Sequence, residues 1–283
     1  MSEGMDAFRL PSGAPVSRLG QGAWQIGDDR RKRTEELLAL NVGLDLGLNL
    51  IDTAEMYGNG RSEELVAEVV AGRREQIYLV SKVLPENATR SGTIAACERS
   101  LKRLKTDYLD LYLLHWRGSV PLEETLEAFT TLRDRGSIRR YGVSNFDRAD
   151  IEEAASLPGG TDIATNQVLY NLEHRGVEFE LEPWCREREI PLMSYSPLGS
   201  DSRRLRTHPV LKKLAARLGA TPARLALAWL LRQPDVVVIP KAASEAHVRD
   251  NHAALKLSLS ADDLAELDRT FPPPKGPTPL AMI

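Results

Sequence analysis

Short apolar runs alternate with longer amphipathic stretches along almost the whole of this 283-residue chain. The short runs are nearly continuous in apolar side chains, which is typical of parallel strands that are covered on both faces. They fall at residues 18–20, 48–51, 77–81, 109–114, 138–143, 163–168, 190–194 and 236–239. Strands that alternate with helices in this way indicate an α/β fold with a parallel sheet. Eight such units favour closure into a (β/α)8 barrel, or TIM barrel, which typically takes ~250 residues.

The stretches between the strands carry the signals that begin helices. Ser62 precedes two glutamates, as an N-cap precedes an acidic first turn, and Pro121 is typical of a helix start. Ser260 precedes two aspartates in the same way. The predicted helices lie at about residues 30–46, from 62 onward, 91–104, 121–133, from 147 onward, 177–188, 207–218, 221–232, 244–253 and 260–270.

The N-terminal segment does not follow the strand–helix pattern. Residues 8–16 predict two short strands around a Ser–Gly turn, and such an N-terminal β-hairpin would close the bottom of the barrel. No linker, charge block or low-complexity stretch divides the rest of the chain. We therefore expect residues 1–283 to form a single domain.

Composition excludes several classes of partner. The chain has 37 Lys and Arg against 40 Asp and Glu, a net charge of −3, so neither nucleic acid nor an anionic membrane is an expected partner. Cys97 and Cys185 are too few for a disulfide framework and fit a reduced, cytoplasmic setting. No signal peptide is visible, and no apolar run approaches the ~18 residues that span a bilayer. We expect a monomer or a weak oligomer.

Four polar residues stand at or just beyond the ends of strand-like runs. Asp52 ends the run at 48–51 and Tyr57 follows it closely, while Lys82 and His115 end the next two runs. Parallel α/β folds carry out their chemistry at the carboxyl ends of the strands. An acid, a phenol, an ammonium and an imidazole at this edge therefore predict one proton-donating site.

The chemistry that suits these four side chains is carbonyl reduction, which needs a hydride for carbon and a proton for oxygen. Tyr57 would serve as the general acid if its pKa fell from ~10 toward neutrality, and a neighbouring Lys82 ammonium would lower it. Asp52 would keep that ammonium charged and oriented. His115 would donate a hydrogen bond that polarises the substrate carbonyl.

Each of these residues also has an ordinary structural interpretation when it is taken alone. Asp52 could cap a helix or form a turn, and Tyr57 could be a loop aromatic next to Gly58. Lys82 could be solvated, and His115 could be a hydrogen-bonded histidine at the barrel rim. The joint pattern at successive strand ends favours the functional interpretation.

At these residues the chain resembles an aldo-keto reductase. The matching stretches are DTAEMYG at 52–58, LVSKV at 79–83, DYLDLYLLHW at 107–116, GVSNF at 142–146, TNQV at 165–168, SYSPLG at 194–199 and VIPK at 238–241. They follow one another in the family's order, within a resemblance that covers about residues 18–270. Together with the region at 273–276, they make the chain most similar to bacterial members that resemble methylglyoxal reductase.

The resemblance implies an enzyme that reduces small aldehydes and ketones to alcohols with NADPH, bound in an extended form without a Rossmann domain. Methylglyoxal and other 2-oxoaldehydes are among the implied substrates, and NADH is the alternative cofactor. The resemblance implies Tyr57 as the proton donor, with Lys82 and Asp52 as its tuning pair. It implies His115 as the residue that orients the substrate.

The resemblance also implies a set of cofactor-binding residues. Three polar side chains would hold the nicotinamide carboxamide: Ser144, Asn145 and Gln167. Tyr195 would stack on the nicotinamide ring, and Trp24 and Trp116 would wall the substrate cleft. Taken alone, Ser144 and Asn145 would instead indicate a turn with a helix cap, and Tyr195 would indicate packing at the rim. The other implied cofactor contacts are Gly22, Ala23, Trp24, Ser196, Leu198, Lys241, His247 and Asn251.

The match is weaker around the site expected for the phosphate on the adenosine ribose. Lys241 would meet this phosphate, but His247 stands where many relatives have an arginine, and a neutral imidazole is a poorer phosphate partner. NADPH is therefore the expected cofactor, and the sequence leaves open how strongly it is preferred over NADH. We interpret the basic and polar segment 199–206 as a solvated surface loop, with a clasp over the cofactor pyrophosphate as the alternative.

Three other functions compete with this interpretation. A Rossmann enzyme needs a glycine fingerprint, and the glycines in residues 20–27 have the wrong spacing for it. A metal-dependent hydrolase needs clustered ligands, but of the five scattered histidines only His115 ends a strand, so no metal is expected. A catalytically weak, cofactor-sensing regulatory subunit of the same fold stays open as the alternative to an enzyme.

Overall fold

The computed structural model of the protein describes residues 15–283. Eight strands form one parallel sheet in the order β1 to β8. They are β1 Gln21–Gly22, β2 Leu50–Asp52, β3 Tyr78–Val83, β4 Leu109–Leu114, β5 Ile138–Ser144, β6 Ile163–Leu169, β7 Leu192–Tyr195 and β8 Val236–Val238. Parallel bridges from Leu19 to Val238 and from Gly22 to Lys241 join the first segment to the last. The sheet therefore closes on itself, and the predicted (β/α)8 barrel is confirmed.

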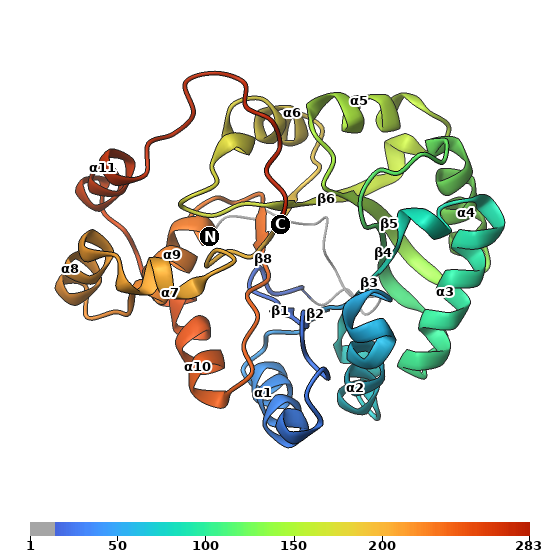
Figure 1. Cartoon of the computed structure of the whole chain (residues 1–283), viewed down its shortest axis with the longest axis horizontal. Helices are drawn as coiled ribbons and strands as arrows, with labels where there is room; N and C mark the ends of the chain where they lie inside the picture. Colours follow the sequence, from blue (N-terminus) through green and yellow to red (C-terminus); the bar gives the residue numbers. More distant parts are fainter. Residues whose placement is uncertain (1–14) are drawn as a thin grey trace.

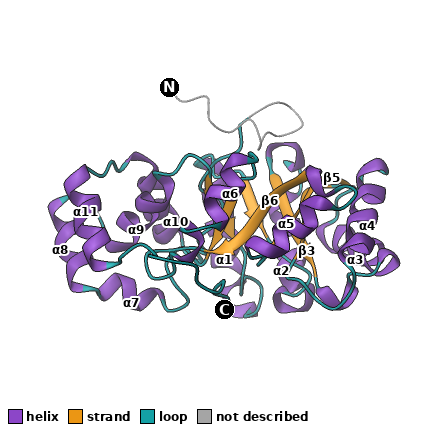
Figure 2. Cartoon of the chain, turned by 90° about the horizontal axis from the view of Figure 1, so that it is seen from above, coloured by secondary structure: helices purple, strands orange, loops and turns teal. Residues whose placement is uncertain are grey.

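Helices surround the barrel, as Figures 1 and 2 show from two directions. They are α1 Arg33–Asp45, α2 Arg61–Val70, α3 Arg90–Leu104, α4 Leu122–Asp134, α5 Arg148–Ser156, α6 Leu181–Glu187, α7 Ser202–Thr207, α8 Pro209–Arg217, α9 Pro222–Leu231, α10 Glu245–Ala253 and α11 Ala261–Thr270. The short 3-10 helices are η1 Arg30–Lys32, η2 Tyr57–Gly60, η3 Arg74–Gln76, η4 Pro85–Asn87, η5 Gly160–Asp162, η6 Gly176–Glu178 and η7 Ala254–Lys256.

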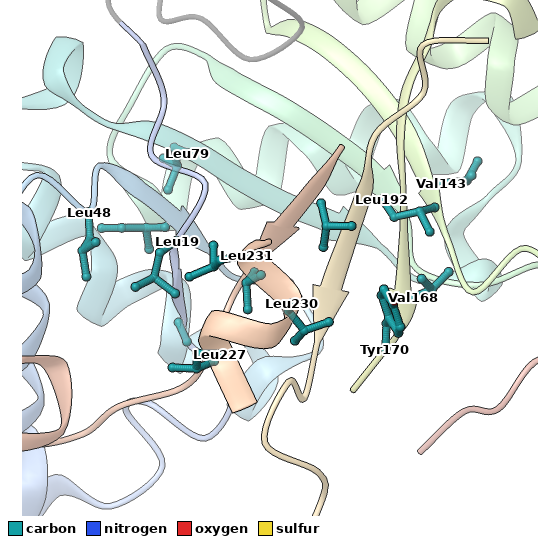
Figure 3. Close-up of a cluster of buried hydrophobic side chains, with 14 of the residues drawn as sticks. Leu19, Leu48, Leu79, Val143, Val168, Tyr170, Leu192, Leu227, Leu230 and Leu231 are labelled. Carbon is teal, nitrogen blue, oxygen red and sulfur yellow. The ribbon is translucent and has the colours of Figure 1, made fainter. Parts of the chain in front are cut away.

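Apolar side chains fill the space on both faces of the sheet. A small cluster that includes Leu50, Val80 and Leu111 shares one face of neighbouring strands, and the larger cluster lies between the strands and the helices. Figure 3 shows side chains of α9 in that larger cluster, near strand residues such as Leu192. Because side chains alternate along a strand, this packing also fixes which face the polar residues at the strand ends occupy.

Polar caps begin several helices where the sequence predicts them. Asp147 and Ser260 each form a capping box, at the starts of α5 and α11. The predicted cap at Ser62 is wrong, because α2 begins one residue earlier, after the left-handed Gly60. The Ser62 hydroxyl is buried and donates instead to the Ala23 carbonyl, at 3.0 Å. It therefore ties α2 to the loop after β1.

Other differences lie at element boundaries. Segment 199–206, interpreted as a loop, contains most of α7, where the Asp201 carboxylate caps the helix by accepting from the Arg203 N–H. The helix expected at 177–188 is divided into η6 and the shorter α6. Most of the expected hairpin at residues 8–16 lies outside the described residues. Among residues 15–283, no helix is long and apolar enough to cross a membrane.

The ring of Phe129, on α4, is fully buried. It lies 5.3 Å from the Tyr141 ring of β5 and 5.8 Å from the Tyr112 ring of β4. Replacing it by Ala removes these contacts and leaves a cavity. We expect Phe129→Ala to lower the free energy of unfolding by about 3–5 kcal/mol, measured by urea denaturation. Leu38→Ala, at a half-exposed position of α1, is the control and should change it by less than about 0.5 kcal/mol. Equal losses would contradict the packing.

Candidate active site

Four polar side chains converge at the carboxyl ends of β2, β3 and β4. Asp52 is the last residue of β2, Lys82 lies one residue before the end of β3, and His115 follows β4 directly. Tyr57 begins η2, in the connection from β2 to α2. Lys82 is two residues beyond Val80, which belongs to the small apolar cluster, so the lysine occupies the same face of its strand.

The Lys82 ammonium is the centre of the group. Its Nζ donates to Asp52 Oδ2 at 2.8 Å, to the Thr53 carbonyl at 2.8 Å and to Tyr57 Oη at 3.1 Å. An ammonium has three N–H donors, and three acceptors satisfy them here. The Tyr57 ring also lies 5.8 Å from the His115 ring, edge to face. The structure therefore brings together all four residues that the sequence singled out.

Burial governs the protonation of this group. Burial is the largest influence on the Tyr57 phenol and raises its pKa above the ordinary value, and the opposing effect of Lys82 does not cancel it. The expectation that Lys82 brings this pKa toward neutrality is therefore not met. Burial also acts to lower the pKa of Lys82, but Asp52 and Tyr57 together outweigh it and leave that pKa raised. At neutral pH the phenol is protonated and the ammonium is charged.

His115 is neutral under the same conditions. Burial, supported by the positive charge of Lys82, lowers its pKa to about 3. Its Nδ1 atom is buried and has no hydrogen-bond partner among the described residues. A neutral imidazole carries one N–H donor and one acceptor nitrogen, so this side chain can bind a carbonyl oxygen without bringing a second positive charge next to Lys82.

A cleft of about 1200 Å³ opens above the four residues. Asp52, Tyr57 and His115 line it, whereas Lys82 is fully buried beneath. Of the residues expected to bind cofactor or substrate, Ala23 is the exception, because it is fully buried and does not reach the cleft. The others all line it: Gly22, Trp24, Trp116, Ser144, Asn145, Gln167, Tyr195, Ser196, Leu198, Lys241, His247 and Asn251.

Amide side chains connect the ends of β5, β6 and β7 to Asp52 and His115. Gln167 Nε2 donates to Asp52 Oδ1 at 2.8 Å, so it holds the carboxylate oxygen that Lys82 leaves free. Asn145 Nδ2 donates to the His115 carbonyl at 3.1 Å, and Asn145 Oδ1 accepts from the Tyr195 hydroxyl at 2.8 Å. Two residues predicted to bind cofactor thus also order the floor of the cleft.

The backbone is unusual at two of these cleft residues. Asn145 has φ 59° and Ser196 has φ 44°, in the left-handed region that is costly for residues with a side chain. Asn tolerates this conformation comparatively well, and the Ser196 carbonyl is held by Asn171 Nδ2 at 2.9 Å. Such strained residues cluster at ligand sites.

Several cleft residues were not foreseen from the sequence. Arg206, which comes from α7, lines the same cleft as Lys241. Met282 and Ile283 also line it, because the C-terminal tail runs from α11 past α6 to the middle of the barrel (Figure 1). Segment 199–206 was interpreted as a solvated loop, and only the alternative of a clasp over the cofactor pyrophosphate anticipated Arg206 at the cleft. The sequence carries no pattern that places the tail.

The cleft suits a phosphorylated dinucleotide. It is large enough for an extended ligand, and amide, hydroxyl and aromatic side chains gather beside Asp52, Tyr57 and His115. Lys241 and Arg206 supply cations that form no ion pair within residues 15–283, so both are free to meet phosphate. At Gly22 an added Cβ would lie 2.8 Å from the Ile239 carbonyl oxygen, so only glycine fits this part of the wall.

A metal centre has no support in the described part of the chain. No group of three or more His, Cys, Asp or Glu side chains among residues 15–283 could hold a metal ion. The fold and the site instead define a barrel protein with a protonated phenol beside a buried ammonium, under a cleft that suits a nucleotide.

Comparisons with known proteins agree with this class. The profile described as "Aldo/keto reductase family" matches residues 18–271. Methylglyoxal reductase YeaE of Escherichia coli K12 is 50% identical over 268 residues, which cover 94% of each chain. Glyoxal reductase of Bacillus subtilis 168 is 32% identical, over 93% of this chain and 92% of that protein. An aldo-keto reductase from Klebsiella pneumoniae, solved in complex with NADPH, has TM-score 0.94 and 47% identity, and covers 97% of this chain and 98% of its own.

This chain belongs to the aldo/keto reductase family. It is accordingly an NAD(P)H-dependent oxidoreductase. The resemblance predicted from the strand-end motifs is confirmed.

The low pKa of His115 should make the free energy of unfolding depend on pH. An unfolded histidine titrates near ~6.5, whereas the folded one titrates at about 3. Between these values the unfolded state binds a proton that the folded state does not, so the free energy of unfolding falls as pH falls, by up to about 1.4 kcal/mol per pH unit. We expect His115→Asn to have a shallower acid dependence in urea unfolding at pH 7, 6 and 5. Parallel curves for parent and variant would show that His115 is not buried in its neutral form.

Proposed function

We propose that this protein reduces small aldehydes and ketones with NADPH, and that methylglyoxal and other 2-oxoaldehydes are among its substrates. The methylglyoxal and glyoxal reductases that it resembles over most of its length support the substrate class. The solved relative in complex with NADPH supports the cofactor. The observation that carries the proposal is the contact of 3.1 Å between Lys82 Nζ and Tyr57 Oη at the floor of the cleft.

Tyr57 donates the proton in this proposal. NADPH, when bound, supplies the hydride that reduces the carbonyl carbon. Negative charge then develops on the carbonyl oxygen, and the Tyr57 phenol, protonated at neutral pH, transfers its proton there. The adjacent Lys82 ammonium stabilises the phenolate that is left, and Asp52 keeps the ammonium in place.

His115 orients the substrate. The imidazole is neutral, nine-tenths buried and close to the Tyr57 ring, so it can donate one hydrogen bond to the same carbonyl oxygen. Trp24 and Trp116 stand on either side of this group, with the Trp24 ring 5.0 Å from the Tyr57 ring and the Trp116 ring 4.9 Å from the His115 ring. They would confine a small carbonyl compound between them.

The cofactor would be held by the residues that line the rest of the cleft. Ser144, Asn145 and Gln167 would meet the nicotinamide carboxamide, and Tyr195 would face the ring. Lys241 would bind the phosphate on the adenosine ribose, with His247 and Asn251 nearby. The remaining contacts would come from Gly22, Trp24, Ser196 and Leu198.

A cofactor-sensing regulatory role is the alternative, and the geometry favours an enzyme over it. A sensor needs the nucleotide cleft but has no need of a protonated phenol beside a buried ammonium. The chain holds both, and Gln167 and Asp52 order that pair. We further propose that the chain folds as a single domain, because every strand within residues 15–283 belongs to one closed sheet.

Tyr57→Phe tests the proton donor, because it removes the hydroxyl and keeps the ring. We expect kcat with methylglyoxal to fall by about 100-fold or more, since general acid catalysis contributes about 10²–10⁴-fold. NADPH affinity, measured by quenching of tryptophan fluorescence, should stay close to that of the parent. Turnover is followed by the loss of NADPH absorbance. A variant as fast as the parent would refute the assignment of Tyr57.

Lys241→Ala tests the proposed phosphate contact. A charge-assisted hydrogen bond contributes about 1.5–3 kcal/mol, so the dissociation constant for NADPH should rise about 10–100-fold. NADH lacks this phosphate, and its dissociation constant should rise far less. Lys213→Ala, an exposed lysine of α8 outside the cleft, is the matched control. Equal weakening of both nucleotides in Lys241→Ala would place the lysine elsewhere on the cofactor.

A further inference from the structure

Glu55 lies two residues before Tyr57, in the connection between β2 and η2, and is not one of the catalytic residues proposed above. Its side chain is 7% exposed, which is low for a carboxylate. It points to the loop after β3, the strand that carries Lys82. Glu55 Oε1 accepts from the Leu84 N–H at 2.9 Å and from Asn87 Nδ2 at 2.9 Å.

The backbone of Glu55 reaches the same strand. Its N–H donates to the Lys82 carbonyl at 3.4 Å, and upstream the Thr53 N–H donates to the Val80 carbonyl at 2.9 Å. Glu55 therefore contacts both Lys82 and the loop that follows it. The Arg99 guanidinium lies 3.7 Å from Glu55 Oε2, but it is half exposed and the pair is long, so it adds little.

The hydrogen bond between Lys82 and Tyr57 tolerates little displacement of either side chain. The distance of 3.1 Å between Lys82 Nζ and Tyr57 Oη is already at the long end for a hydrogen bond, and a small further separation would break it. Tyr57 comes from a loop, whereas Lys82 comes from a strand that pairs with β4 at Leu113 and with β2 as far as Val80. The loop side of the pair therefore depends more on additional contacts.

We infer that Glu55 is a positioning residue that fastens the Tyr57 loop to the loop after β3 and so fixes the phenol on the Lys82 ammonium. The inference rests on the proposed role of Tyr57 as proton donor. Glu55 itself touches neither the substrate cleft nor the ammonium. It acts through the hydrogen bonds to Leu84 and Asn87, which hold the two loops against each other.

Three variants separate the contacts of Glu55. Glu55→Ala removes both acceptor bonds, and we expect kcat to fall about 10–100-fold, as small misplacements of catalytic groups do. Glu55→Gln keeps a carbonyl oxygen that can accept both bonds and should restore most of the rate. Asn87→Ala removes one bond from the other side and should give an intermediate loss. In all three, NADPH affinity should stay close to that of the parent, because the cofactor residues are untouched.

Asp110 offers a matched control. It is likewise a buried carboxylate that accepts a backbone N–H, from Leu79 at 2.9 Å, and pairs with Arg74 at 2.7 Å. It lies near the amino ends of β3 and β4, away from Tyr57. Asp110→Ala should lower the melting temperature and leave kcat near the parent value, with Asp110→Asn as the substitute if the Ala variant does not fold. A fall in kcat that merely follows lost stability would appear in this control too.

A double-mutant comparison tests whether Glu55 acts through Tyr57. If it does, Glu55→Ala should lower kcat much less in the Tyr57→Phe background than in the parent, because the group being positioned is already absent. An undiminished loss in that background, or a Glu55→Ala variant as fast as the parent, would overturn the inference. Tyr57→Phe alone, in the same assay, tests the proposed function separately, since a fast Tyr57→Phe enzyme would reject the proton donor whatever Glu55 does.

Hydrogen exchange gives a readout that does not need turnover. Peptides covering residues 53–60 and 84–89 should exchange faster in Glu55→Ala than in the parent, and return toward the parent rate in Glu55→Gln. Asp110→Ala should leave both peptides unchanged. Unchanged exchange in Glu55→Ala would show that the loops hold their places without this carboxylate and would contradict the inference.

Discussion

A buried ammonium at the mouth of the barrel is the interaction on which the arrangement of this site depends. Lys82 is fully buried, and an unpaired charge there would be destabilising by several kcal/mol. Asp52, the Thr53 carbonyl and Tyr57 satisfy its three donors. The connection after β2 must therefore fold back over the end of β3. The contacts that satisfy this buried charge also place the Tyr57 phenol above it. One geometry therefore stabilises the lysine and positions the phenol.

The closed parallel sheet lets residues far apart in the chain meet at this point. Gln167, which is 115 positions from Asp52, donates to it because β2 and β6 deliver their carboxyl ends to the same side of the barrel. Asn145 joins the ends of β4, β5 and β7 through the His115 carbonyl and the Tyr195 hydroxyl. Residues on the strands are held by the sheet, whereas a residue on a connecting loop needs further contacts to hold its position. Tyr57 lies on such a loop, and the role inferred for Glu55 is to hold that loop in place.

Much of the fold, and the meeting of Asp52, Tyr57, Lys82 and His115 at the strand ends, could be predicted from the sequence, because strands covered on both faces are continuous apolar runs and polar residues that interrupt such runs stand out. Features set by tertiary contact could not. Ser62 has the local pattern of a helix cap, yet its hydroxyl bonds to Ala23, which only the folded barrel brings near. The tail residues Met282 and Ile283 reach the cleft by a path that no local pattern encodes. The raised pKa of Tyr57 depends on the extent of burial, which a strand-end position alone does not give.

Burial has opposite consequences for the two neutral groups beside the ammonium. It opposes charge on both, so it raises the pKa of the Tyr57 phenol and lowers that of the His115 imidazole. Both side chains consequently stay neutral and keep an N–H or O–H to donate, and Lys82 is the one positive charge within the group. An oxygen that gains negative charge between the phenol and the imidazole would meet two donors and a fixed cation behind them. The buried ammonium favours negative charge on the phenol oxygen and opposes positive charge on the imidazole. The arrangement would therefore stabilise the phenolate that remains if the phenol gives up its proton.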